Sequence, residues 1–214
     1  MLYSELQCSD AIHKAVERMG FAEMTEIQEK TIPVMMAGYD VIAKAPTGTG
    51  KTCAFGIPVA EHILPENKYP QAVIMAPTRE LAQQIAQELE ELTYFMPEVQ
   101  VACVYGGANM EKQAKRLAEG CQIVVATPGR LMDHYKHHSI DISHVTQIVL
   151  DEADEMLNMG FREDIESVLA QIPEERQTVL FSATMPPAIL AITKQYQKEP
   201  VLVQIQSAHR TVDA

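Results

Sequence analysis

Short apolar runs rich in valine and isoleucine recur along the chain between longer segments of mixed polarity. These runs occupy residues 40–45, 72–76, 99–106, 122–127, 147–154, 178–184 and 201–205. Their apolar residues are consecutive and do not alternate with polar ones, as expected of strands that helices cover on both faces of a parallel sheet. The pattern predicts an α/β fold, with a doubly wound, mostly parallel sheet and helices on both faces.

The domain organisation follows from this pattern and from the length of 214 residues, which suits one sizeable domain. We expect residues 1–29 to pack on a core domain of residues 30–206, and residues 207–214 to begin a linker. The most loop-like segment of the core is 62–71, which contains two prolines and an asparagine.

Composition narrows the function classes. The chain has 17 Lys and Arg against 29 Asp and Glu, a net charge of −12, so any nucleic-acid site must be local. No apolar run approaches the roughly 20 residues that span a bilayer, and no signal-peptide pattern opens the chain. We expect a monomeric, cytoplasmic protein without membrane contact.

The cysteines and a group of histidines are candidate metal ligands, but another interpretation is preferred for each group. The four cysteines are Cys8, Cys53, Cys103 and Cys121. They form no C-x-x-C pair, so we expect small buried apolar residues and not a zinc or disulfide framework. His134 lies one helical turn from His137 and His138, a spacing that can bind metal. A solvated helix end, where histidine complements the helix dipole, is the preferred interpretation.

A glycine-rich loop follows the first predicted strand, at the strand end where open parallel sheets bind ligands. The loop comprises Ala45, Pro46, Thr47, Gly48, Thr49, Gly50, Lys51 and Thr52. Its glycines let backbone N–H groups face an anion, and Lys51 supplies a cation to the β- and γ-phosphates. The hydroxyl of Thr52 is placed to bind Mg²⁺. Ala45 departs from the usual glycine, but the flanking strand and helix favour a phosphate site over a surface turn with an exposed lysine.

Carboxylates end the fifth predicted strand. Burying Asp151 and Glu152 is costly unless a cation meets them, and Mg²⁺ held together with Thr52 is the natural partner of Asp151. If the chain turns at the strand end, Glu152 becomes the candidate general base for an attacking water. Asp154, taken alone, is as well explained by the start of a helix, where anions are favoured.

The order of these and further motifs resembles the first RecA-like domain of DEAD-box RNA helicases. The motifs are GFAEMTEIQ (20–28), APTGTGKT (45–52), PTREL (77–81), GG (106–107), TPGR (127–130), DEAD (151–154) and SAT (182–184). The resemblance covers essentially the whole chain, and it implies a RecA-like P-loop NTPase fold that binds ATP and Mg²⁺.

The resemblance also implies an adenine site. Gln28 looks like the family's adenine-reading glutamine, because an amide offers one donor and one acceptor to adenine. Tyr3 stands where the family usually has an isolated phenylalanine, and Phe21 belongs to the same motif. Met24 replaces the usual proline, which leaves the local turn less constrained. The alternative for Gln28 is a solvent-facing helix position.

RNA contacts are implied at other strand-end loops. The matching residues are Pro77, Thr78, Arg79, Gly106, Gly107, Thr127, Pro128, Gly129 and Arg130. Glycines permit close approach, and threonine hydroxyls and arginines bind phosphate oxygens without reading sequence. Either arginine could instead cap a helix or pair with a carboxylate. Ser182 and Thr184 resemble the motif that links hydrolysis to strand separation, and they lack the base partner of a serine hydrolase.

The family's activity implies a second RecA-like domain that supplies arginine fingers and the other half of the RNA site. Residues 1–214 should therefore bind nucleotide but be nearly inactive, whereas the complete protein is expected to be an ATP-dependent RNA helicase. A nucleotide-gated RNA clamp or scaffold with little unwinding remains the alternative. A P-loop kinase of small molecules would explain Lys51 but not the SAT, TPGR or glutamine motifs.

Overall fold

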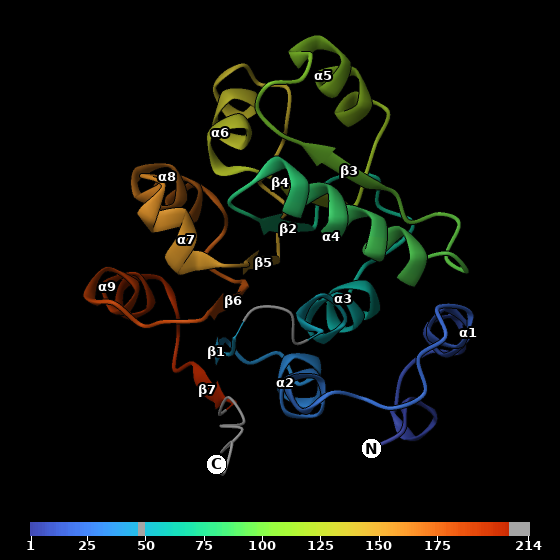
Figure 1. Ribbon diagram of the computed structural model, residues 1–214. Helices are drawn as coiled ribbons and strands as arrows, with labels where there is room; N and C mark the ends of the chain where they lie inside the picture. Colours follow the sequence, from blue (N-terminus) through green and yellow to red (C-terminus); the bar gives the residue numbers. More distant parts are fainter. Residues whose placement is uncertain (47–49, 206–214) are drawn as a thin grey trace, which may run out of the picture.

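The computed structural model describes residues 1–46 and 50–205, and its centre is a parallel sheet (Figure 1). The strands are β1 (Val41–Lys44), β2 (Ala72–Met75), β3 (Val101–Val104), β4 (Ile123–Ala126), β5 (Gln147–Leu150), β6 (Gln177–Ser182) and β7 (Val201–Gln204). They form one seven-stranded sheet in the order β3-β4-β2-β5-β6-β1-β7. Six strands lie within the apolar runs and β6 begins one residue before its run, so the predicted fold class is confirmed.

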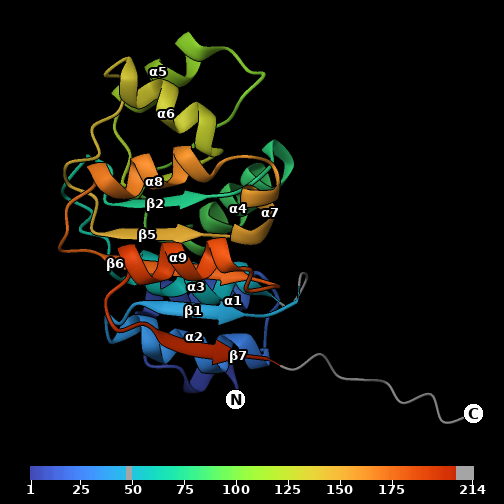
Figure 2. The ribbon, with the colours of Figure 1, turned by 90° about the vertical axis from the view of Figure 1, so that its left-hand side faces the viewer.

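All six strand pairings are parallel, so the carboxyl ends of the strands lie at one edge of the sheet and the amino ends at the other. Figure 2 shows the arrows of β1, β2, β5 and β7 pointing the same way. In β1, Val41 lies opposite Val179 of β6 and Val201 of β7, so the first strand is held between the last two.

Helices cover both faces of the sheet (Figure 1). The helices of one layer are α1 (Asp10–Arg18), α2 (Glu26–Met36), α3 (Lys51–Glu61) and α4 (Arg79–Leu92), preceded by the 3-10 helix η1 (Tyr3–Glu5). Those of the other layer are α5 (Met110–Ala118), α6 (Pro128–Lys136), α7 (Ala153–Asn158), α8 (Arg162–Gln171) and α9 (Pro187–Tyr196). Two apolar cores result, because alternate strand residues face opposite layers: Val179 and Phe181 join the first core and Leu180 joins the second.

The segments that carry the motifs are strand-to-helix transitions at one edge of the sheet. α3 follows β1, α4 follows β2, α6 follows β4 and α7 follows β5. Segment 62–71 contains no helix or strand, as predicted. α2 runs without a break across the expected boundary between residues 29 and 30, so the amino-terminal segment enters the core through a shared helix. The linker expected at 207–214 lies outside the described residues.

Two expectations about side-chain burial need correction. Cys53 and Cys121 are buried as expected, but Cys8 and Cys103 are only half-buried. His134 is fully buried and not part of a solvated helix end, because it faces α5 and bonds to Gln113. Across the described ranges, no helix is both long and apolar enough to cross a membrane.

Candidate functional site

The phosphate loop ends where α3 begins. Gly50 has a φ of 76°, in the left-handed region that favours glycine, and α3 starts with Lys51. Thr52 lies half-buried in the first turn of the helix. On the strand side, the Ala45 N–H donates to the carbonyl of Ser182 at 3.2 Å, which extends the β1–β6 pairing to the loop. Pro46 follows at the surface, and the predicted loop residues Thr47, Gly48 and Thr49 lie outside the described residues.

Lys51 and Asp151 meet at the carboxyl edge of the sheet. Lys51 Nζ lies 3.5 Å from Asp151 Oδ1, and the two side chains are only 8% and 3% exposed. Asp151 Oδ1 also accepts a hydrogen bond of 2.9 Å from the Glu152 N–H. Burial raises the pKa of Asp151 although Lys51 acts to lower it. The structure therefore brings the cation of the phosphate loop and the first carboxylate of the DEAD motif into one buried pair.

Glu152 occupies the turn from β5 into α7. Its φ of 50° is in the left-handed region, which a non-glycine residue adopts only at a cost. The backbone therefore leaves the strand direction at this residue, as the sequence suggested. Glu152 is half-buried, and its pKa is raised chiefly by burial, which outweighs the lowering effect of Lys51. A carboxylate with a raised pKa is suited to accept a proton near neutral pH.

Asp154 ties α7 to the segment after β6. Its Oδ2 accepts hydrogen bonds from the Thr184 hydroxyl at 2.8 Å and from the Thr184 N–H at 3.1 Å. Its Oδ1 accepts from the Glu155 N–H at 3.0 Å, within the first turn of α7. The Ser182 hydroxyl donates to the Thr184 carbonyl at 2.6 Å. Asp154 thus has the helix-start position that the sequence allowed and also connects the DEAD and SAT motifs.

Gln28 connects the start of α2 to the phosphate loop. Its Oε1 accepts hydrogen bonds from the Tyr3 hydroxyl and from the Thr25 N–H, the latter at 2.9 Å. Its Nε2 donates to the Gly50 carbonyl at 3.0 Å. A Cβ atom on Gly50 would come within 2.9 Å of this Nε2, so glycine is needed for the contact. Gln28 is buried and does not face solvent.

Tyr3 and Phe21 stack near Gln28, with ring centroids 6.3 Å apart and an interplanar angle of 23°. Tyr3 is buried, whereas Phe21 is 45% exposed. Of this pair, Phe21 offers the larger accessible ring surface, and Tyr3 supports both Phe21 and Gln28. The resemblance implies both residues at the adenine site, and their contact with the base stays a prediction.

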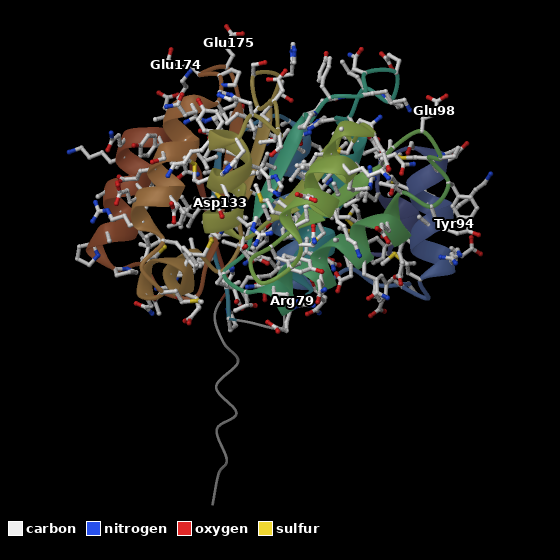
Figure 3. The ribbon with its side chains drawn as sticks, turned by 90° about the horizontal axis from the view of Figure 1, so that it is seen from above. Arg79, Tyr94, Glu98, Asp133, Glu174 and Glu175 are labelled. Carbon is white, nitrogen blue, oxygen red and sulfur yellow. The ribbon has the colours of Figure 1, made fainter. Side chains whose placement is uncertain are left out.

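Loop 77–79 lies at the same edge of the sheet. Arg79 is exposed, and its guanidinium lies 4.8 Å from the centroid of the Tyr105 ring. Thr78 caps α4 by accepting from the Leu81 N–H at 3.2 Å, and Pro77 is buried. Figure 3 shows Arg79 at one edge of the molecule and Glu174 and Glu175 at the opposite edge.

The other two loops predicted to contact RNA are also near each other. Gly106 and Gly107 are exposed, and Gly107 has a φ of 84°. Arg130 Nη1 donates to the Ala108 carbonyl at 2.9 Å, and its Nε lies 3.8 Å from Asp133 Oδ2. Thr127 and Pro128, both buried, start α6, and Gly129 follows them. Arg130 is thus largely engaged within the protein, which matches the alternative of an ion pair. Its contact with RNA stays a prediction.

Sequence reasoning missed two residues of this region, Tyr105 and Gln113. The Arg79 guanidinium lies over the Tyr105 ring, and the Gln113 side chain donates a hydrogen bond of 3.0 Å to the Tyr105 carbonyl. Gln113 belongs to no motif. The available signal was its place four residues before Leu117 on an amphipathic helix, since positions i and i+4 share a face and Leu117 is buried.

A family model of the DEAD/DEAH box helicases matches residues 25–192, more than half of the chain. The chain belongs to this family. It is 51% identical over its whole length to "ATP-dependent RNA helicase CshA" of Limosilactobacillus reuteri and covers 43% of that protein. Over 98% of its length it is 47% identical to "ATP-dependent RNA helicase DeaD" of Escherichia coli, of which it covers 33%. This DEAD-box domain thus spans less than half of these relatives.

Solved structures agree with the DEAD-box assignment. A crystal structure of a DEAD box protein from the hyperthermophile Methanococcus jannaschii superposes with a TM-score of 0.90 at 40% identity, covering 96% of this chain and 56% of that one. A hypothetical ATP-dependent RNA helicase from Sulfolobus tokodaii gives a TM-score of 0.85 at 39% identity, covering 92% and 57%. The RecA-like fold predicted for the DEAD-box domain is confirmed.

Proposed function

We propose that this DEAD-box domain binds ATP, Mg²⁺ and the RNA backbone as the nucleotide-binding half of an ATP-dependent RNA helicase. In the complete protein, a second RecA-like domain closes on it, and ATP hydrolysis drives local unwinding of RNA duplexes. The observation that carries the proposal is the meeting of Lys51, Asp151 and Gln28 around the phosphate loop, from three segments far apart in sequence.

Nucleotide binding follows from this arrangement. Lys51 supplies the positive charge for the β- and γ-phosphates, and the amino end of α3 adds its dipole. The Gln28 amide, now bonded to Tyr3, Thr25 and Gly50, is the proposed adenine contact, and its bond to Gly50 links the base site to the loop. Phe21 provides an exposed ring for stacking.

Thr52 and Asp151 are the residues that would hold Mg²⁺. Hydroxyl and carboxylate oxygens suit this ion, which keeps several waters and needs only one or two carboxylates. Burial raises the pKa of Asp151 although Lys51 acts to lower it, and a bound cation beside this carboxylate would favour its charged form. When bound, Mg²⁺ neutralises phosphate charge. Glu152 orients the attacking water and accepts its proton.

RNA binding is proposed at the loops that follow β2, β3 and β4. Arg79 is an exposed charge-assisted donor, and Gly106 and Gly107 leave the backbone open to close approach. Such contacts bind phosphate and sugar, so the domain selects RNA by backbone shape and not by sequence.

Adenine selectivity tests the proposal. Titration of residues 1–214 should give at least about tenfold tighter binding of ADP than of GDP, because the Gln28 amide matches adenine and not guanine. Gln28→Ala should weaken ADP binding by about 1–3 kcal/mol and remove most of the selectivity. Gln71→Ala is the matched control. Gln71 is equally buried and its side chain also makes three hydrogen bonds, but it lies directly before β2, at the amino edge of the sheet. Equal affinities for ADP and GDP in the unmodified chain would contradict the adenine assignment.

A further inference from the structure

A buried polar cluster lies between α5 and α6, outside every recognised motif. It consists of Gln113 and His134, which are 8% and 0% exposed. A fully buried histidine and a buried glutamine are costly unless their polar atoms are bonded. Their partners therefore show what the cluster holds in place.

Gln113 stands at the centre of the cluster. Its Nε2 donates to the Tyr105 carbonyl at 3.0 Å, which fixes the orientation of the amide. Its Oε1 then accepts from Arg130 Nη1 and from His134 Nε2, both at 3.1 Å. Because this oxygen only accepts, His134 Nε2 is the donor, and on the other side of the ring Nδ1 lies 2.7 Å from the Ser139 hydroxyl, which itself donates to the His134 carbonyl at 3.1 Å. Burial and the neighbouring Arg130 lower the pKa of His134, which agrees with a neutral ring.

Gln113 and its partner Arg130 form hydrogen bonds on both sides of the Gly106–Gly107 pair. Gln113 holds the carbonyl of Tyr105, directly before Gly106, and Arg130 Nη1 holds the carbonyl of Ala108, directly after Gly107. Two adjacent glycines have wide conformational freedom, and ordering them when a ligand binds costs conformational entropy. Bonds at both ends place this loop before any ligand arrives.

Tyr105 extends the connection to the third loop. The Arg79 guanidinium lies 4.8 Å from the Tyr105 ring centroid, and the Tyr105 hydroxyl accepts from Gln83 Nε2 of α4 at 3.0 Å. The loops 77–79, 106–107 and 127–130 are thus joined through Tyr105 and Gln113, which no motif includes.

We propose that Gln113 and His134 are positioning residues for RNA binding, which hold Arg130 and the Gly106–Gly107 loop in the geometry that receives the RNA backbone. The inference rests on the proposed RNA function. In this arrangement Arg130 acts mainly by bracing the loop, and Arg79 is the exposed contact.

The test compares two buried glutamines in the complete protein. Gln113→Ala should weaken the binding of a fluorescent single-stranded oligouridylate at least about tenfold, measured with a non-hydrolysable ATP analogue present. Its affinity for ADP should stay within about twofold of the unmodified protein, because the cluster does not touch the nucleotide residues. Gln122→Ala is the control: Gln122 is also buried with three hydrogen bonds, but before β4 at the opposite edge of the sheet. It should lose a similar amount of thermal stability and keep its RNA affinity.

His134 supplies an independent variant in case Gln113→Ala folds poorly. His134→Ala should weaken RNA binding, and His134→Gln, which retains a donor toward Gln113, should recover part of it. If Gln113→Ala and Gln122→Ala affect RNA equally, or if both His134 variants bind as tightly as the unmodified protein, the positioning role is wrong. Arg79→Ala separates the two proposals. If Arg79→Ala weakens RNA binding and Gln113→Ala does not, only the inference is wrong. If neither variant weakens RNA binding, the proposed RNA site is wrong as well.

Discussion

At the scale of single residues, Lys51 and Asp151 each make the burial of the other tolerable. A lone buried ammonium or carboxylate loses its hydration, and the nearby opposite charge offsets part of that loss. The pKa of Asp151 is nevertheless raised, because the effect of burial outweighs the attraction of Lys51. In the proposed function, a cation bound beside Asp151 would compensate its charge when Lys51 contacts phosphate.

Glu152 and Lys51 should behave differently when changed. In the complete protein, Glu152→Gln should still bind ATP, because the amide preserves size and Asp151 is intact, but RNA-stimulated phosphate release should fall about 10²- to 10⁴-fold through loss of the base. Lys51→Ala should instead lose most triphosphate binding, since the cation of the phosphate loop is gone. Phosphate release and binding of an ATP analogue distinguish the two outcomes. Loss of ATP binding in Glu152→Gln would assign Glu152 to the metal site.

At the scale of elements, helix α3 positions Lys51 by packing closely on α4. A Cβ atom on Gly56 would lie 2.8 Å from Leu92 Cδ1 and 3.1 Å from Leu89 Cδ2, and both leucines are fully buried. Glycine in a helix interior is less favourable than alanine by roughly 1 kcal/mol. The close approach of the two helices is the structural reason for Gly56.

Gly56→Val should destabilise the domain by about 1–3 kcal/mol, because the added methyl groups overpack the α3–α4 contact. Urea unfolding of residues 1–214 measures the loss. Gly56→Ala is the graded control, since its gain in helix propensity opposes a smaller clash, and it should lie between the valine variant and the unmodified chain. A valine variant as stable as the unmodified chain would show that the two helices separate easily.

The elements themselves were predictable to a large extent. Apart from the first residue of β6, all seven strands fall in the apolar runs, because strands buried on both faces leave a continuous apolar signal. The site edge was predictable too, since parallel strands end together and the unusual residues follow them. The ion pair of Arg130 with Asp133 was among the sequence alternatives, but the burial of His134 and the bond from Arg130 to Gln113 were not predictable, because both depend on a residue of a separate helix. Local spacing does not encode such tertiary partners.

At the scale of the whole molecule, the proposed RNA edge lies away from one pair of acidic residues. The chain carries a net charge of −12, yet Arg79 lies at the edge opposite to Glu174 and Glu175 (Figure 3). An RNA strand approaching the carboxyl edge of the sheet therefore avoids part of the acidic surface. Few phosphate contacts also mean a shallow dependence of RNA affinity on salt, because each contact releases about one counterion.

Residues 1–214 alone should bind ADP weakly, bind RNA feebly and show no unwinding. The γ-phosphate lacks the arginines that we assign to the second RecA-like domain, a contribution of about 10³ to 10⁵ in rate in related nucleotide hydrolases. Phosphate release should be measured with and without RNA on this chain and on one extended through the second domain. Adding that domain as a separate polypeptide should restore little, because the roughly millimolar effective concentration of a short linker is lost. Strong RNA-stimulated turnover by residues 1–214 would contradict this division of labour.

The placement of β1 between β6 and β7 has a consequence for synthesis on the ribosome. The strand that leads into the phosphate loop ends at Lys44, but both of its neighbours come from residues 177–204. At about 5–20 residues per second, translation needs on the order of ten seconds to reach them. During that interval β1 has exposed edges and no partner, and Lys51 has no Asp151 until residue 151 is made. We expect the nascent chain to acquire nucleotide binding late and abruptly, and to need protection of its apolar strands until then.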